Sequence, residues 1–137
     1  MISRKIGFLL LAVYTAAVIS GCAAGGKVTD FDKNTTSVSK LQLADSGTLS
    51  IYDGNAVHEV ALKEIKCLRI ENDITTTYNR ELYYRVEVVL RNGTTIGSLK
   101  NRDTRVYVAV NHYLEGESEG GPYRILLADV SRLEIRY

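Results

Sequence analysis

The chain has 137 residues and a mass of 15.2 kDa, which leaves room for one small domain. With 17 Lys and Arg against 16 Asp and Glu, the formal net charge is +1, and this argues against nucleic acid as the main partner because phosphate binding needs a surplus of clustered cations. A hydrophobic content of 45 % is too high for a disordered chain.

The first residues have the pattern of an export signal. Arg4 and Lys5 precede an uncharged apolar run, Ile6 to Ile19. As a helix this run would rise about 21 Å, which is short of the ~30 Å hydrocarbon core of a bilayer. We therefore interpret residues 1–21 as a helical signal peptide rather than a membrane span.

The segment Ile19-Ser20-Gly21-Cys22 resembles the lipobox of bacterial lipoproteins. The resemblance implies cleavage before Cys22, lipidation of that cysteine, and attachment to a membrane through acyl chains. Ala23 is not acidic, which in lipoproteins of enteric bacteria favours the outer membrane over the inner one, here with the domain facing the periplasm. The alternatives are an ordinary secretory signal, with Cys22 left as a plain thiol, and an uncleaved anchor.

After the anchor, residues 22–45 are rich in Gly, Ser, Thr and Asn and show weak hydrophobic periodicity. This composition predicts a flexible linker that holds the domain away from the membrane. We expect the folded β-domain to span residues 46–137.

The β-domain is predicted from alternating apolar residues and from turn signals. Asp53-Gly54 and Asn92-Gly93 are typical of tight hairpin turns. No stretch has a sustained helical period, so we expect an all-β fold. The predicted strands lie around Leu49–Ile51, Ala56–Leu62, Tyr84–Leu90, Val106–Leu114 and Tyr123–Leu127.

An internal echo relates residues 62–70 to residues 127–135, with apolar residues at the same four positions and an acidic residue before the second of them. We expect each copy to be a strand end, a single tight helical turn and a short closing strand. Glu64 and Asp129 are then structural rather than catalytic carboxylates.

The predicted order of strands from Tyr84 to Ile135 resembles the small open barrels of the SH3 and Sm-like type. Gly97-Ser98-Leu99 followed by Asp103 is similar to the first Sm motif. The resemblance implies a small, antiparallel, partly open barrel. It does not carry RNA binding across, because the family's RNA-contacting asparagine would fall near Tyr107.

Chemical sites have little support in the sequence. His58, His112 and Cys67 are not spaced as zinc ligands, and no nucleotide or nucleophile motif is present, so we expect no metal, no cofactor and no enzyme activity. Cys67 fits either a small strand residue or a disulfide between chains. His112 fits a hydrogen-bonded residue at a barrel rim. The acidic loop Glu115–Gly121 fits a solvated hairpin better than a calcium site.

A surface of tyrosine and arginine is the main predicted interaction site. Its members alternate away from the valine-rich face, and tyrosine is enriched at protein interfaces. They are Tyr83, Tyr107, Tyr113, Arg85 and Arg105. The sequence thus predicts a non-catalytic module that binds an envelope protein through this surface or a strand edge. The alternatives are a module for glycan, peptidoglycan or a small ligand, and tyrosines that only form cross-strand pairs.

Overall fold

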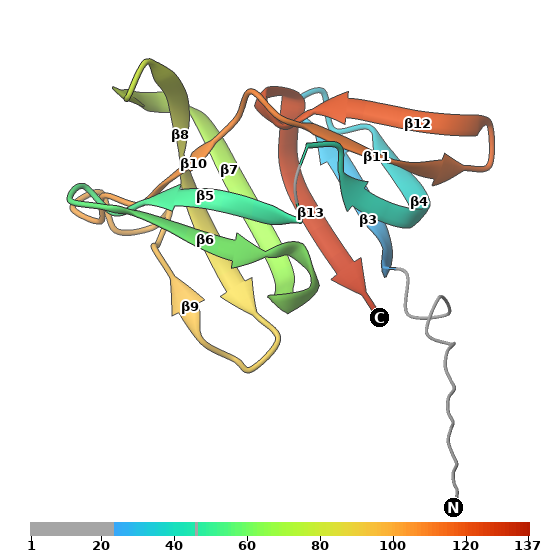
Figure 1. Cartoon of the computed structure of the whole chain (residues 1–137), viewed down its shortest axis with the longest axis horizontal. Helices are drawn as coiled ribbons and strands as arrows, with labels where there is room; N and C mark the ends of the chain where they lie inside the picture. Colours follow the sequence, from blue (N-terminus) through green and yellow to red (C-terminus); the bar gives the residue numbers. More distant parts are fainter. Residues whose placement is uncertain (1–23, 46) are drawn as a thin grey trace, which may run out of the picture.

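The computed structural model describes residues 24–45 and 47–137, which form one antiparallel sheet of eleven strands (Figure 1). The strands are β3 (Ala24–Asp30), β4 (Thr35–Leu43), β5 (Thr48–Tyr52), β6 (Val57–Ala61), β7 (Ile65–Tyr78), β8 (Glu81–Leu90), β9 (Thr95–Ile96), β10 (Tyr107–Ala109), β11 (Tyr113–Ser118), β12 (Gly121–Leu126) and β13 (Val130–Arg136). Two short 3-10 turns, η2 (Leu62–Glu64) and η3 (Leu127–Asp129), interrupt them. The predicted all-β, antiparallel, partly open barrel is confirmed.

No helix among the described residues has the length and apolar character that a membrane crossing requires. The predicted signal peptide, residues 1–21, and the predicted lipidation site, Cys22, lie outside the described residues.

The prediction of a flexible linker over residues 22–45 is wrong from residue 24 onwards. Residues 24–30 and 35–43 are strands, and β3 lies inside the sheet between β4 and β13. Val28 and Val38 are 1 % and 4 % exposed, so this segment contributes to the core. The folded domain therefore begins at least as early as Ala24.

The sheet is built from two five-stranded halves that meet at β13 and β7. Its order is β12-β11-β4-β3-β13-β7-β8-β10-β5-β6, with β9 paired to β8 outside this path. Each half curls on itself, as the left and right parts of Figure 1 show. Read outwards from the centre, β7, β8, β10, β5 and β6 correspond in position to β13, β3, β4, β11 and β12.

The two halves are related by an internal two-fold axis, and this axis also relates the two copies of the predicted echo. Leu68 pairs with Leu133, and the neighbouring pairs are Arg69 with Arg132 and Cys67 with Glu134. Because the echo maps residue 68 onto residue 133, this register places the Leu68–Leu133 pair on the two-fold axis. The helical turns predicted in both copies are confirmed as η2 and η3.

The two halves do not follow each other along the chain. The whole of one half, residues 48–109, is inserted between β4 and β11 of the other, and its strands occur in a circularly permuted order. The strands from Tyr84 to Ile135 are therefore divided between the two halves of the sheet. The alternating set from Val106 to Leu114 is not one strand, because residues 110–112 cross from one half to the other.

One apolar core fills both halves. Its central members are at most 2 % exposed and come from seven of the eleven described strands. They include Val28, Ile51, Ile65, Leu68, Val86, Val88, Val108, Val110, Leu114, Leu127 and Leu133. Since both halves share this core, we expect them to unfold as one unit.

The two predicted Gly turns are confirmed. In the β8–β9 hairpin, Gly93 has φ 92° and the Leu90 N–H donates to the Thr94 carbonyl at 2.8 Å. In the β5–β6 turn, Gly54 has φ 96°, and one Asp53 carboxylate oxygen accepts the N–H groups of Asn55 and Ala56 at 2.8 and 2.9 Å. Asp53 also lies 2.9 Å from His58 Nε2.

The Asp53 turn should make stability depend on pH in the acid range. Its backbone hydrogen bonds lower the pKa of Asp53 from 3.8 to about 2, so the folded state favours the charged carboxylate. The stability that Asp53 contributes is therefore complete above about pH 4 and is lost as the pH falls from about 4 towards 2.

We expect Asp53→Asn, which keeps an acceptor oxygen without a charge, to reduce the loss of stability between pH 4 and pH 2. Urea unfolding at both pH values measures this loss, and Asp103→Asn at an exposed loop position is the control. An unchanged acid dependence in Asp53→Asn would contradict the role of this turn.

Candidate functional site

The predicted tyrosine–arginine surface is not assembled in the structure. Tyr83 and Arg85 are each 2 % exposed and Tyr107 is 9 % exposed, whereas Tyr113 and Arg105 are exposed. The prediction is therefore wrong for three of its five residues. Alternation correctly placed Tyr83 and Tyr107 away from the valine-rich core, but other segments cover that face.

Four tyrosines form a small second core on the outer face of β5, β8 and β10. Tyr52 stacks on Tyr78 with ring centroids 4.4 Å apart, and it lies 5.7 Å from Tyr83 and 6.4 Å from Tyr107. Ile74 packs against the same cluster. Burial raises the pKa of Tyr83. Because two of the four rings are buried, this cluster is packed protein interior and not the open aromatic groove that a glycan would need.

Arg85 fixes the loop between β9 and β10 over the outer face of the sheet. Its Nη1 donates to Glu71 at 3.1 Å, and its Nη2 donates to the carbonyls of Ser98, at 2.8 Å, and Asn101. The planar guanidinium group can bridge a carboxylate and two carbonyls in this way, which a lysine could not do. Arg85 is thus a structural residue.

His112 lies where the chain crosses between the two halves. Its Nε2 is 2.7 Å from a Glu81 carboxylate oxygen, and its Nδ1 is 3.7 Å from Asp45. This hydrogen-bonded position agrees with the predicted one. Within residues 24–45 and 47–137, no group of three His, Cys, Asp or Glu side chains is arranged to hold a metal ion.

Cys67 is a half-buried free thiol on the outer face of β7. Burial raises its pKa, so the thiolate form that a nucleophile or metal ligand needs is disfavoured. In the predicted acidic hairpin loop, Glu115 and Glu117 form ion pairs across the strands with Arg124, at 3.4 Å, and Lys40, at 3.6 Å. Neither feature is arranged for catalysis.

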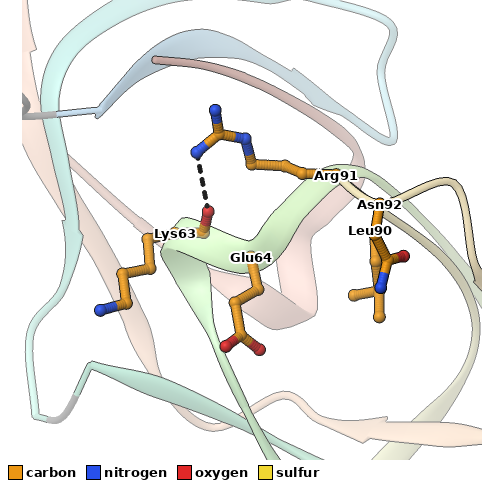
Figure 2. Close-up of a pocket in the computed structure, with 5 residues that line it drawn as sticks. All are labelled: Lys63, Glu64, Leu90, Arg91 and Asn92. Carbon is orange, nitrogen blue, oxygen red and sulfur yellow. Dashed lines mark hydrogen bonds between the residues drawn. The ribbon is translucent and has the colours of Figure 1, made fainter.

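A basic hollow lies where β8 ends and η2 begins. No motif or spacing in the sequence predicted it. It has a volume of about 600 Å³ and is lined by Lys63, Glu64, Leu90, Arg91 and Asn92 (Figure 2). The backbone N–H of Arg91 donates to the Glu64 carbonyl at 2.8 Å, and its side chain reaches the Lys63 carbonyl at 3.5 Å. Figure 2 shows the Lys63 and Glu64 side chains pointing away from this guanidinium group.

An apolar hollow of about 550 Å³ adjoins the basic one. Tyr137 connects the two, because its ring lies 4.2 Å from the Arg91 guanidinium carbon and its hydroxyl donates to the Leu62 carbonyl at 2.5 Å. The sequence holds no local signal for this site, since β3, β4, β5, β6 and residue 137 all contribute to it. The apolar hollow is lined by Ala24, Leu41, Gln42, Leu43, Gly47, Thr48, Ala61, Leu62, Lys63 and Tyr137.

The main path of the sheet ends in two free edges among the described strands, β6 and β12. The two-residue strand β9, which pairs only with β8, has a further short edge outside this path. In the β5–β6 ladder the Asp53 N–H donates to Ala56 and the Leu62 N–H donates to Gly47. Hydrogen-bonding residues alternate along a strand, so Val57, Glu59 and Ala61 point their N–H and carbonyl groups away from β5. These groups form an open row along β6.

The β12 edge differs from the β6 edge because it carries a proline. The Leu127 N–H donates to the His112 carbonyl at 2.8 Å, so the register with β11 turns residues 122, 124 and 126 outwards. Pro122 has no N–H group, which removes one donor from this row. Between the two free edges, β6 is the better template for an added strand.

Comparison with protein-family models, curated proteins and solved structures finds no match to this chain. The function must therefore be argued from the residues and the geometry of the chain itself.

Proposed function

We propose that the chain is a bacterial envelope lipoprotein, anchored through acylated Cys22, that acts as a non-catalytic interaction or assembly module. The lipobox resemblance at residues 19–22 and the apolar run before it support the anchor. Several acyl chains hold a protein on a membrane almost permanently, whereas one chain binds only marginally. Ala23 favours the periplasmic side of the outer membrane as the location.

The open edge of β6 carries the proposal of a protein partner. An extended segment of a partner can add to a free edge through main-chain hydrogen bonds. The outward N–H and carbonyl groups of Val57, Glu59 and Ala61 form a row that no proline interrupts. Among the described strands, β6 pairs only with β5. Proteins usually protect such edges, as Pro122 protects β12, so an unprotected one suits a partner strand.

A proline in β6 tests the strand-addition proposal. We expect Glu59→Pro to abolish capture of the partner while leaving the fold intact, because the Glu59 N–H points away from β5 and makes no ladder bond. The measurement is a crosslinked pull-down from solubilised envelope, with prey lists compared between variants. Far-ultraviolet circular dichroism and thermal unfolding check that the fold is kept.

Two variants control this experiment. Glu59→Ala removes the carboxylate that accepts bonds from Thr48 and Ser50 at 2.8 and 2.9 Å but keeps the backbone N–H, so it should retain the partner. Arg124→Pro places a proline at an outward position on the other edge and should also retain it. Identical prey lists for wild type and Glu59→Pro would refute binding through β6.

The anchor is tested by mass. We expect the mature wild-type chain to begin at Cys22, to carry acyl mass and to float with membranes, whereas Cys22→Ser should do none of these. Intact mass spectrometry and membrane flotation measure the difference. An unmodified Cys22 in the wild-type protein would contradict the lipoprotein assignment.

A further inference from the structure

We propose that the anchored domain rests directly on the membrane, with one end of the sheet held against anionic phospholipid headgroups. This end, here called the exit end, consists of residues 24–26, 62–66, 90–92 and 135–137. The inference rests on the proposed lipidation of Cys22 and adds to it a defined membrane-facing surface.

Covalent reach places the start of the sheet close to the membrane. Ala24 is already part of β3, and it lies only two positions after Cys22. An extended residue spans at most ~3.3–3.6 Å, so the sheet begins within roughly 7 Å of the acylated cysteine. A tether this short keeps the domain close to the bilayer, in contrast to the linker that the composition predicts, and it leaves open only which surface of the domain faces the headgroups.

The register of the sheet gathers several strand ends beside Ala24. Gly25 pairs with Arg136 at the end of β13, and Ile65 at the start of β7 pairs with Leu90 at the end of β8. The pairing of β13 with β7 brings these two pairs of strand ends together. Figure 1 shows the C-terminal end of β13 next to the point where the chain enters β3.

The exit end is basic. It carries four basic side chains and one acidic one, Glu64. All five are exposed, and the basic residues are Lys63, Lys66, Arg91 and Arg136. Bacterial membranes contain anionic phospholipids, and a basic surface within a Debye length of such a membrane is attracted to it.

An exposed aromatic ring also lies at this end. Tyr137 is 45 % exposed and lies under the Arg91 guanidinium group. Tyrosine is enriched at membrane–water interfaces, where its ring meets the apolar boundary and its hydroxyl group meets polar groups. The apolar hollow beside it, with Leu41 and Leu62 in its lining, extends this surface towards Ala24.

The opposite end of the sheet, here called the far end, contains the β3–β4 and β7–β8 turns and is not basic. Asp30 at the end of β3 is followed by Asp32 and Lys33 in the β3–β4 turn, and Arg80 lies in the β7–β8 turn directly before Glu81. Acidic side chains thus outnumber basic ones there. An anionic membrane surface therefore attracts the exit end and not the far end.

The test measures the distance of each end from the bilayer on the full, acylated chain. The protein is reconstituted on phosphatidylglycerol-containing vesicles that carry a nitroxide quencher at the lipid headgroup. Cys67→Ser removes the native free thiol, and a fluorophore is attached to Glu64→Cys at the exit end or to Asp32→Cys at the far end. These two sites are separated by about the length of β3, roughly 20 Å.

We expect strong quenching of the fluorophore at residue 64 and weak quenching of the fluorophore at residue 32. Equal, weak quenching at both sites would overturn the inference and show a domain that stands off or tumbles. Intact mass of the same samples separates this failure from failure of the proposed function, because an unacylated Cys22 would refute the anchor instead.

The role of charge is tested by paired variants. Lys63→Gln/Arg91→Gln should lose quenching at residue 64 on anionic vesicles, whereas Lys33→Gln/Arg80→Gln, which removes the same charge from the far end, should not. Wild type on phosphatidylcholine vesicles should show the same loss. Equal quenching on anionic and neutral vesicles would overturn the assignment of anionic headgroups as the partner.

Discussion

Replacing Leu68 by alanine is expected to destabilise the whole domain by about 3–5 kcal/mol, near the upper end of the range for buried leucines. Leu68 is 0 % exposed and pairs with Leu133 at the junction of the two halves. The alanine would leave a cavity at the centre of a shared core, where both halves constrain the backbone and cannot close in to fill it.

A second prediction follows from the internal two-fold axis at the same site. Leu133 is also 0 % exposed and occupies the equivalent position, so Leu133→Ala should cost a similar amount. The free energy of unfolding is measured by urea denaturation with circular dichroism and fluorescence. Leu99→Ala in the half-buried loop after β9 is the control and should cost clearly less.

The cooperativity of unfolding tests whether the Leu68–Leu133 junction holds the two halves together. If the halves share one core, both variants should shift a single transition, equally by every probe. A separate early transition for one half in Leu68→Ala, or a cost below about 1 kcal/mol for either leucine, would show that the junction does not hold the halves together.

The sequence was sufficient for the elements whose signals are local. The alternation in β8, the Asn92-Gly93 hairpin and the two 3-10 turns of the echo all depend on residues close together in the chain. These features also led to the correct fold class, an antiparallel and partly open barrel.

The strands β3 and β4 were missed because their alternation is broken. The buried residues of β4 are Val38, Leu41 and Leu43, and the odd step from 38 to 41 contains Lys40 with φ 53°. The β3–β4 register also shifts between Ala24 and Gly26. A bulge of this kind defeats a search for period two, so a strand with ordinary burial looks like a linker.

The predicted interaction surface failed for a different physical reason. Alternation separates the two faces of a strand, but it does not say which segments from elsewhere will cover the outer face. Ile74 and Tyr78 of β7, together with Tyr52 and Val57, pack against the cluster that holds Tyr83 and Tyr107. The exit end was missed for the same reason, since it combines strands as distant in sequence as β3 and β13.

The second large effect is expected from Gly26→Ala. A Cβ atom at residue 26 would lie 2.0 Å from the Glu134 carbonyl oxygen and 3.2 Å from the Ile135 Cα atom. These atoms belong to backbone of the neighbouring strand and cannot rotate away. We expect a loss of about 3 kcal/mol or more, at or above the upper end of the usual cost of overpacking.

Gly26→Ala should act locally before it acts globally, because β3 can separate from β13 while the half formed by β5–β8 and β10 stays paired. Hydrogen–deuterium exchange should then rise in β3 and β13 and change little in β5 and β6. Gly120→Ala, whose Cβ would approach no atom more closely than 4.0 Å, is the control and should change the stability by about 0.5 kcal/mol or less. Uniformly raised exchange, or stability like that of the control, would contradict the role of close packing at Gly26.

The same variant connects the fold to the proposed orientation on the membrane. In the native sheet, β3 holds the exit end within two residues of Cys22. If Gly26→Ala releases β3, residues 24–30 become the flexible linker that their composition suggests, and the reach from the anchor grows by about 3.3 Å for each residue freed. We therefore expect Gly26→Ala to lose headgroup quenching at residue 64 while Cys22 stays acylated. Retained quenching together with raised exchange in β3 would mean that the exit end stays on the membrane through its basic residues alone.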